Sequence, residues 1–313
     1  MPAVSAFLVT GTPLPVLRPD NPPWRALREA FDLAAQALKD SRPDVLLVYS
    51  TRWIAVLDAL WQTRARLTGV HVDEVWHDYG DLPHDIRIDV DLAAACVAAT
   101  NAAGIRAKGV DYDAFPVDTG TVVANTLLNG GAEPRPLVVT ANNIYHDAET
   151  TERLGALAMR LAEKQGKAAA VLAIGGLSRQ FFDREVEPAR DAISNREHDE
   201  LNRRLLDLLA AGDVEAVRAF LPEYSLRARA DHHMKHLSWL LGATGGFEGA
   251  TVHAYGPDYG AGAAVVQFAP VSASRRRSLD DAAARSRPGP RVWRPPAPQR
   301  DRGAPQVEAR RAP

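Results

Sequence analysis

The 313-residue sequence contains a single cysteine, Cys96, and therefore has no means of forming an internal disulfide. Because Cys96 lies in an alanine-rich helical stretch, we interpret it as a buried structural residue and expect a cytoplasmic location. No apolar run reaches the ~18 residues that a membrane-spanning helix needs. Residues 1–9 lack the basic start of a signal peptide and are predicted to be a first strand. These absences predict a soluble globular protein.

Charge is distributed unevenly along the chain. Residues 275–313 contain 11 arginines and four acidic residues, a surplus of +7 in a chain whose formal net charge is −2. The same segment contains seven prolines. Such a composition buries too little apolar surface to offset the entropy lost on folding, so residues 271–313 are predicted to form a disordered tail. We interpret this tail as a solvated extension and expect no nucleic-acid partner.

Residues 1–270 alternate between short apolar runs and helical runs, without a repeat or a linker. Short strands that are almost entirely apolar are typical of a sheet covered on both faces. The alternation predicts a single α/β domain with a mixed central sheet flanked by helices. The strand candidates are residues 5–9, 44–49, 105–110, 137–140, 168–174, 251–254 and 263–268. The helix candidates are residues 24–41, 90–103, 148–165, 197–211, 214–220 and 232–241.

Polar or glycine-rich loops follow several of these strands, where open α/β sheets carry their functional sites. Such loops occupy residues 10–15, 50–53, 111–120, 141–146 and 175–179. In the first, second and last loops and in residues 117–121, there is no histidine or cysteine, and Asp118 is the one carboxylate. These segments offer hydroxyl groups and two arginines, Arg52 and Arg179. A pocket built from them would suit an anion but has few groups for acid–base catalysis.

The order of these loops resembles the class III, or LigB-type, extradiol ring-cleavage dioxygenases. In that family a histidine lies in the first loop beside prolines, and a second follows the second strand in Ser-Pro-His-Trp. A third lies in Asp-His-Gly-Thr and a fourth in Gly-Gly-Leu-Ser-His. The resemblance implies that the first two, with a glutamate from a late helix, hold Fe(II). It also implies that the later two act in acid–base chemistry and in support of the metal ligands.

This sequence keeps the four motifs and changes the functional residue in each. The altered positions are Gly11 or Thr12, Arg52, Thr119 and Arg179. A guanidinium stays protonated and has no lone pair to offer a metal. We therefore expect Arg52, together with Arg179, to fill or cap the emptied pocket, and no catalytic residue is expected in this chain.

The resemblance covers residues 1–270 and is greatest to the non-catalytic α subunits of two-subunit enzymes that cleave 2-aminophenol. The late helical stretch at 230–243 also lacks a glutamate before its glycine. The resemblance implies a chain that binds no cofactor of its own and stabilises a homologous catalytic β subunit carrying Fe(II). The complex would cleave an aromatic substrate in aromatic catabolism, and no membrane partner is expected.

A cluster of histidines leaves one alternative open. His232 and His236 are spaced i, i+4 and would share a helix face, so that with His233 or Asp231 they would form a relocated metal site of an independent enzyme. Against this, no glutamate follows the first histidine, and the stretch is amphipathic. Packing or a subunit contact is the favoured interpretation.

A second alternative is a module that binds an aromatic ligand through Arg52 and Arg179. His146, which follows a predicted strand, is a further candidate for lining such a pocket. The histidine-containing stretch at 71–85 is interpreted as a solvated loop. Ligand binding, metal binding and a purely structural role thus remain open at this point.

Overall fold

The computed structural model describes residues 3–180 and 185–271, so the predicted tail lies outside it except for Val271. A mixed eight-stranded sheet forms the centre of the described chain. Its strands lie in the order β6 (Ala107–Val110), β3 (Ala59–Gln62), β7 (Leu137–Asn143), β2 (Val45–Ala55), β8 (Ala169–Ile174), β1 (Ser5–Val9), β10 (Ala261–Pro270) and β9 (Phe247–Asp258). The four central strands β7, β2, β8 and β1 are parallel, whereas β3 and β10 run antiparallel to their inner neighbours.

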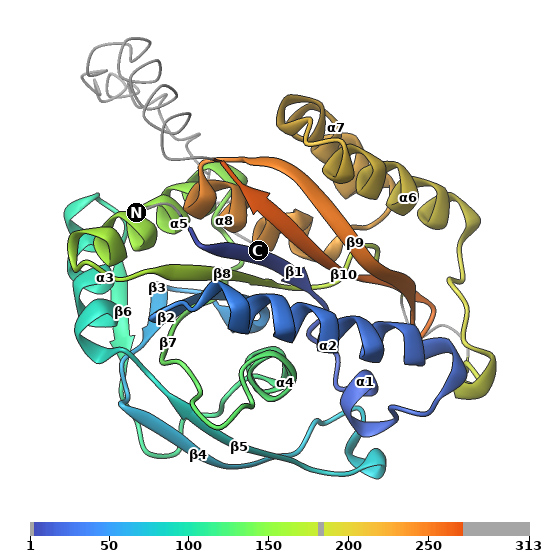
Figure 1. Cartoon of the computed structure of the whole chain (residues 1–313), viewed down its shortest axis with the longest axis horizontal. Coiled ribbons are helices and arrows are strands. Elements are labelled where there is room, and N and C mark those ends of the chain that lie inside the picture. The colour runs from blue at the N-terminus through green and yellow to red at the C-terminus, as the bar shows by residue number, and fades with distance from the viewer. Residues whose placement is uncertain (1–2, 181–184, 272–313) are drawn as a thin grey trace, which may run out of the picture.

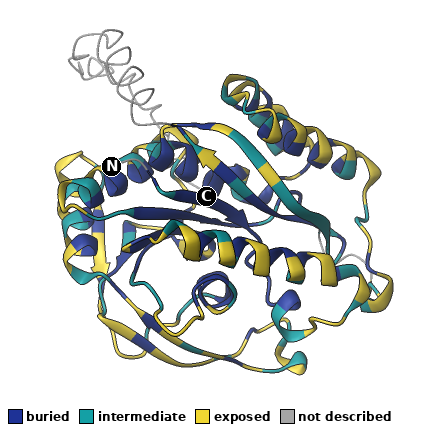
Figure 2. Ribbon diagram, in the orientation of Figure 1, coloured by how far each residue is buried: buried dark blue, intermediate teal, exposed yellow. Residues whose placement is uncertain are grey.

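Helices cover both faces of the sheet (Figure 1). One face packs against α2 (Pro22–Ser41) and α4 (Thr119–Leu128), and a separate ribbon of β4 (Arg66–His71) and β5 (Leu82–Arg87) lies outside α4. The other face packs against α3 (Val90–Ala102), α5 (Ala148–Lys164), α8 (Lys235–Thr244) and α6 (Arg196–Ala210), and α7 (Val214–Arg227) lies beside α6. Every residue of β1 and β8 is buried, as Figure 2 shows for the central strands. The predicted mixed α/β architecture is therefore confirmed.

Several predicted boundaries are wrong in ways that matter for the site. Residues 50–53 are not a loop, because β2 continues to Ala55 with an irregularity between Ser50 and Ile54. Residues 119 and 120 begin helix α4, which was not predicted, and the Asp118 side chain caps it by accepting from the Thr121 amide. Strands β3, β4 and β5 were also missed. None of the described helices is long and apolar enough to cross a membrane.

Helices α5 and α8 approach each other so closely that two glycines are required. A Cβ atom on Gly242 would lie 2.0 Å from the carbonyl oxygen of Glu152. A Cβ atom on Gly155 would lie 2.3 Å from the carbonyl oxygen of Trp239. This backbone-to-backbone contact fixes α8, and with it the polar residues at its beginning, against the sheet.

Candidate functional site

The altered motif residues come together at the carboxyl ends of the central strands. A Cβ atom on Gly11, which follows β1, would lie 2.9 Å from Cγ2 of Ile174 at the end of β8. It would also lie 3.1 Å from Cα of Gly120 in α4 and 3.4 Å from Cγ of Arg52 in β2. Four segments that are distant in the sequence therefore meet at one point. Because there is no room for a side chain at position 11, a metal-binding histidine would not fit there without displacing its neighbours.

Arg52 occupies the centre of this cluster. Its aliphatic part packs against Gly11 and Gly120, and its guanidinium acts electrostatically on Asp258, at the end of β9. Burial raises the pKa of Asp258 to about 6, while Arg52 and the hydroxyls of Thr12 and Thr10 partly oppose that rise. Sequence reasoning did not identify Asp258, a half-buried carboxylate that is the electrostatic counterpart of Arg52.

A second carboxylate, Asp231, holds the other side of the cluster. Its Oδ2 accepts from the Thr51 hydroxyl at 2.7 Å and from the Gly176 amide at 3.0 Å. Arg179 Nε lies 3.6 Å from Asp231 Oδ1. Burial opposes ionisation, but His236, His232, the Thr51 hydroxyl and Arg179 together lower the pKa of Asp231 below its ordinary value. The substituted arginine at position 179 is therefore matched by an ionised acid.

Thr119, where the family motif has a histidine, joins a buried hydrogen-bonded chain. Its hydroxyl donates to Asp73 Oδ2 at 2.8 Å, and its oxygen lies 2.7 Å from His71 Nε2. Since the single hydroxyl proton goes to Asp73, the His71 ring nitrogen donates to Thr119. The interpretation of residues 71–85 as a solvated loop is wrong at this end, because His71 ends strand β4 and is tied to α4.

Replacing Thr119 by valine removes both hydrogen bonds while nearly preserving the shape of the side chain. We expect a loss of about 1–3 kcal/mol in the free energy of unfolding, because the buried Asp73 carboxylate and the half-buried His71 ring each lose a hydrogen-bond partner. Urea denaturation of the purified variant measures this. Thr119→Ser, which keeps the hydroxyl, is the matched control. An unchanged stability for the valine variant would show that the chain of hydrogen bonds contributes nothing.

The histidine cluster does not form the common helix face that its spacing predicted. His232, His233 and Met234 have positive φ angles of 43°, 57° and 57°, and helix α8 begins only at Lys235. His236 is fully buried against Gly175, and burial lowers its pKa to about 4. The left-handed turn separates His232 and His233 from the helix that carries His236.

The donor set at this site does not fit Fe(II), the metal that the family resemblance implies. Position 11 has no space for a ligand, Arg52 offers a cation, and α8 contains no carboxylate. Asp231 and Asp258 are engaged by hydroxyls, an amide and the two arginines. Among residues 3–180 and 185–271 there is no group of three or more histidine, cysteine or acidic side chains placed to hold a metal ion.

His146 lies in the loop between β7 and α5 and is half-buried. Its amide donates to the Asn143 carbonyl at 3.2 Å, and burial and the charge of Lys235 lower its pKa. The Lys235 ammonium donates to the same carbonyl at 2.6 Å, and burial lowers its pKa to about 8. The described contacts of His146 therefore connect it to the β7–α5 loop and the start of α8.

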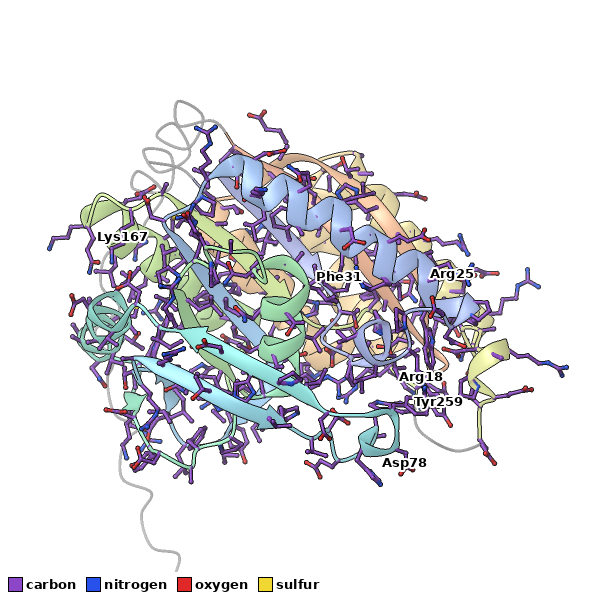
Figure 3. The ribbon with its side chains drawn as sticks, turned by 60° about the horizontal axis from the view of Figure 1, so that its bottom comes forward. Arg18, Arg25, Phe31, Asp78, Lys167 and Tyr259 are labelled. Carbon is purple, nitrogen blue, oxygen red and sulfur yellow. The ribbon has the colours of Figure 1, made fainter. Side chains whose placement is uncertain are left out.

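An aromatic cluster holds the turn that carries Asp258. The Trp76 ring stacks on Tyr79 with centroids 5.7 Å apart and meets the edge of Tyr259 at 4.8 Å. The Arg18 guanidinium lies 4.4 Å from the centre of the Tyr79 ring. Arg18 and Tyr259 lie at the same corner of the molecule in Figure 3. The turn after Asp258 is thus anchored to two other segments, which fixes the acid opposite Arg52.

Comparisons with known proteins agree with these observations. The family model described as "Catalytic LigB subunit of aromatic ring-opening dioxygenase" matches residues 8–268. The chain is 49% identical over 269 residues to the 2-aminophenol 1,6-dioxygenase alpha subunit of Pseudomonas sp., covering 86% of this chain and 99% of the relative. It is 29% identical over 283 residues to the beta subunit, covering 85% and 92%.

A solved structure supports the fold. The crystal structure of the uncharacterized protein JW3007 from Escherichia coli K12 matches with a TM-score of 0.60 at 17% identity. The match covers 84% of this chain and 98% of that protein. At this level of identity the likeness concerns the architecture alone.

Proposed function

We propose that this chain, which belongs to the LigB family of aromatic ring-opening dioxygenase subunits, is the non-catalytic subunit of a two-subunit enzyme. The proposed enzyme opens the ring of 2-aminophenol or a related aromatic compound in aromatic catabolism. The similarity to a protein named as an alpha subunit, together with the separate, less similar beta subunit, supports this assignment.

The observation that carries the proposal is Arg52, which stands where the family resemblance implies a metal ligand. A guanidinium at this position places a permanent positive charge where the family resemblance implies a dication, and half-buried Asp258 provides the compensating acid. In this proposal the protein retains a positive charge at the carboxyl ends of the central strands without a metal. Such an arrangement preserves the fold while removing the chemistry that needs Fe(II) and neutral imidazoles.

The partner in this proposal is a homologous catalytic subunit that carries Fe(II) and the acid–base histidines. This chain contributes a surface that stabilises the partner. The cytoplasmic location expected from the lone, buried Cys96, whose thiol pKa burial raises to about 12, stays a prediction. Stabilising the partner in this way requires no catalytic residue in this chain.

Purification of the chain alone and together with the Pseudomonas beta subunit tests the proposal. We expect the chain alone to bind no stoichiometric iron and to consume no 2-aminophenol, because its donor set does not fit the metal. The coexpressed pair is expected to co-purify and to consume 2-aminophenol with uptake of O₂, faster than the beta subunit alone. Metal analysis and an oxygen electrode provide the two measurements. An active, iron-loaded homo-oligomer of this chain would refute the proposal.

The alternative of an aromatic-ligand module rests on the arginines of the same site. Arg52 and Arg179 are both exposed, so their guanidinium groups are accessible from solvent. Calorimetric titration of the isolated chain with 2-aminophenol distinguishes the two ideas. Saturable binding that Arg52→Met abolishes would favour the module, whereas a flat titration favours the purely structural subunit.

A further inference from the structure

An exposed cluster of large apolar side chains lies at the carboxyl ends of β2 and β7. It comprises Ile54, Val56, Leu57, Ile144 and Tyr145, which we call the apolar platform. Their exposed fractions are 45%, 48%, 74%, 42% and 76%. Scattered apolar residues are normal on a protein surface. Here five large ones lie on two short segments that run side by side, since Ala55 pairs with Asn143 and the Ile144 amide bonds the Ala55 carbonyl. The platform begins two residues after Arg52 on the same strand.

Hydrogen bonds between residues 55–58 and residues 143–145, and one within the second segment, hold the platform in place. The Ile144 amide donates to the Ala55 carbonyl at 3.0 Å, and Asn143 Nδ2 donates to the Asp58 carbonyl at 3.1 Å. The Tyr145 amide donates to Asn143 Oδ1 at 3.0 Å. Because these bonds order the backbone in advance, a partner that docks here loses little free energy in ordering it.

The charged groups that border the platform are already compensated within the chain. Asp58 lies 3.7 Å from Arg106 and 3.5 Å from Lys108. The Asp147 carboxylate accepts from the Thr150 amide as the cap of α5. A surface with an apolar centre and a paired polar rim suits another apolar protein face rather than a nucleic acid or an acidic surface.

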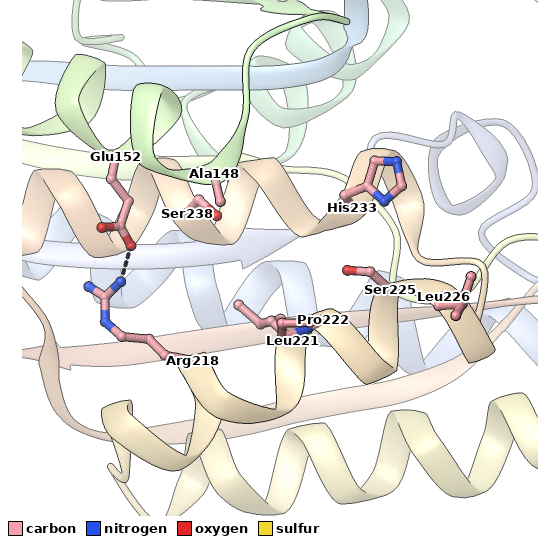
Figure 4. A pocket seen from close by; sticks show the side chains of 9 residues that line it. All are labelled: Ala148, Glu152, Arg218, Leu221, Pro222, Ser225, Leu226, His233 and Ser238. Carbon is pink, nitrogen blue, oxygen red and sulfur yellow. Dashed lines mark hydrogen bonds and ion pairs between the residues drawn. The ribbon is translucent and has the colours of Figure 1, made fainter.

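An apolar groove lies between α7 on one side and α5 and α8 on the other, as Figure 4 shows. It has a volume of about 470 Å³ and is lined mainly by apolar atoms, with Leu221, Pro222 and Leu226 along α7. Leu226 is 80% exposed. Ala148, at the start of α5, lines the groove and follows the platform residue Tyr145 by three positions. An ion pair between Arg218 and Glu152 lies at one end.

We infer that the platform and this groove form the docking surface for the homologous catalytic subunit, an inference that rests on the proposed function. The beta-subunit relative aligns with 85% of this chain, so a partner of that kind has the same fold and an equivalent sheet edge. Identical chains most often associate through two-fold interfaces in which the same patch meets itself, and permanent interfaces are the more apolar ones. The inferred complex uses an equivalent arrangement between this chain and its homologous partner. A preformed apolar surface with a compensated rim matches that kind of contact.

Charge-introducing variants of the full chain, coexpressed with the Pseudomonas beta subunit, test this surface. Leu57→Asp and Tyr145→Asp each bury an unpaired carboxylate if the platform is an interface. We expect each to weaken association at least about thirtyfold, the size of a typical energetic hot spot. Leu33→Asp is the matched control, because Leu33 is 57% exposed on α2, which packs on the opposite face of the sheet from α5 and α8. It is expected to bind like the wild type.

Sedimentation velocity gives the association constants, and circular dichroism reports folding of each variant. Leu57→Ser and Tyr145→Ser replace the aspartates if either charged variant misfolds, and weaker binding is again expected. Binding equal to wild type in folded platform variants would overturn this inference and leave the proposed function standing. Loss of a homodimer of this chain with unchanged beta-subunit binding would also overturn it, since a second copy would then occupy the platform. Failure of the wild-type pair to associate would instead refute the proposed function.

Discussion

Replacing Asp258 by asparagine is expected to stabilise the chain by up to about 3 kcal/mol at pH 7.5 and to have almost no effect below pH 4. Burial raises the pKa of this carboxyl from 3.8 to about 6. In the unfolded chain the group ionises freely, whereas in the folded chain its charge has to be held in a buried site. Asp258 is only half-buried, so solvent screens part of its charge and about 3 kcal/mol is the largest gain in stability expected.

The direction of the pH dependence follows from proton binding. Between pH 3.8 and about 6 the folded state holds the Asp258 proton more tightly than the unfolded state does. Stability from this group therefore falls as the pH rises through that window. Asparagine cannot ionise, but its amide oxygen still accepts hydrogen bonds from Thr10 and Thr12. The variant removes the cost of the buried charge and retains those contacts.

Urea denaturation of the wild type and of Asp258→Asn across pH 4 to 8 measures the difference. Asp147→Asn is the matched control, because hydrogen bonding from Thr150 lowers the pKa of that helix cap. Its loss is expected to destabilise the protein at neutral pH and to matter less in acid. If Asp258→Asn instead lowered stability at pH 7.5, the electrostatic attraction of Arg52 for the ionised Asp258 carboxylate would outweigh the cost of burial.

Replacing Gly242 by alanine is expected to destabilise the protein by about 3 kcal/mol, although helix propensity alone predicts the opposite. In an isolated helix, alanine is favoured over glycine by about 1 kcal/mol. Here the added Cβ atom would lie 2.0 Å from the Glu152 carbonyl oxygen and 2.7 Å from its Cα. Both atoms belong to the backbone of α5, so the helices have to separate and the packing between them is lost.

The midpoint of urea denaturation measures the effect of Gly242→Ala. Gly131→Ala is the matched control, since no heavy atom lies within 4 Å of a Cβ atom built there. That variant is expected to leave stability unchanged or to raise it slightly. A stability gain for Gly242→Ala would mean that α5 and α8 are not held at this separation in solution.

The central strands and longer helices were predictable from the sequence because apolar runs and apolar periodicity depend only on neighbouring residues. The apolar run in residues 5–9 matches β1, and the apolar periodicity in residues 148–165 matches α5 within one residue. Helix α4 was missed because its Thr-Gly-Thr start has poor helix propensity, which burial against the sheet outweighs. Strands β4 and β5 were missed because they are partly exposed and carry a glycine and a proline.

The sequence by itself determined the family, the mixed sheet and the altered motif positions, including Arg52 where a metal ligand is expected. Those features depend on composition, periodicity and short motifs, all of which are local. Only the tertiary structure placed Asp258 opposite Arg52, tied His71 to Thr119 and turned the chain left-handed before α8. These contacts join segments far apart in the chain, and no local pattern encodes which loops meet when the strands assemble.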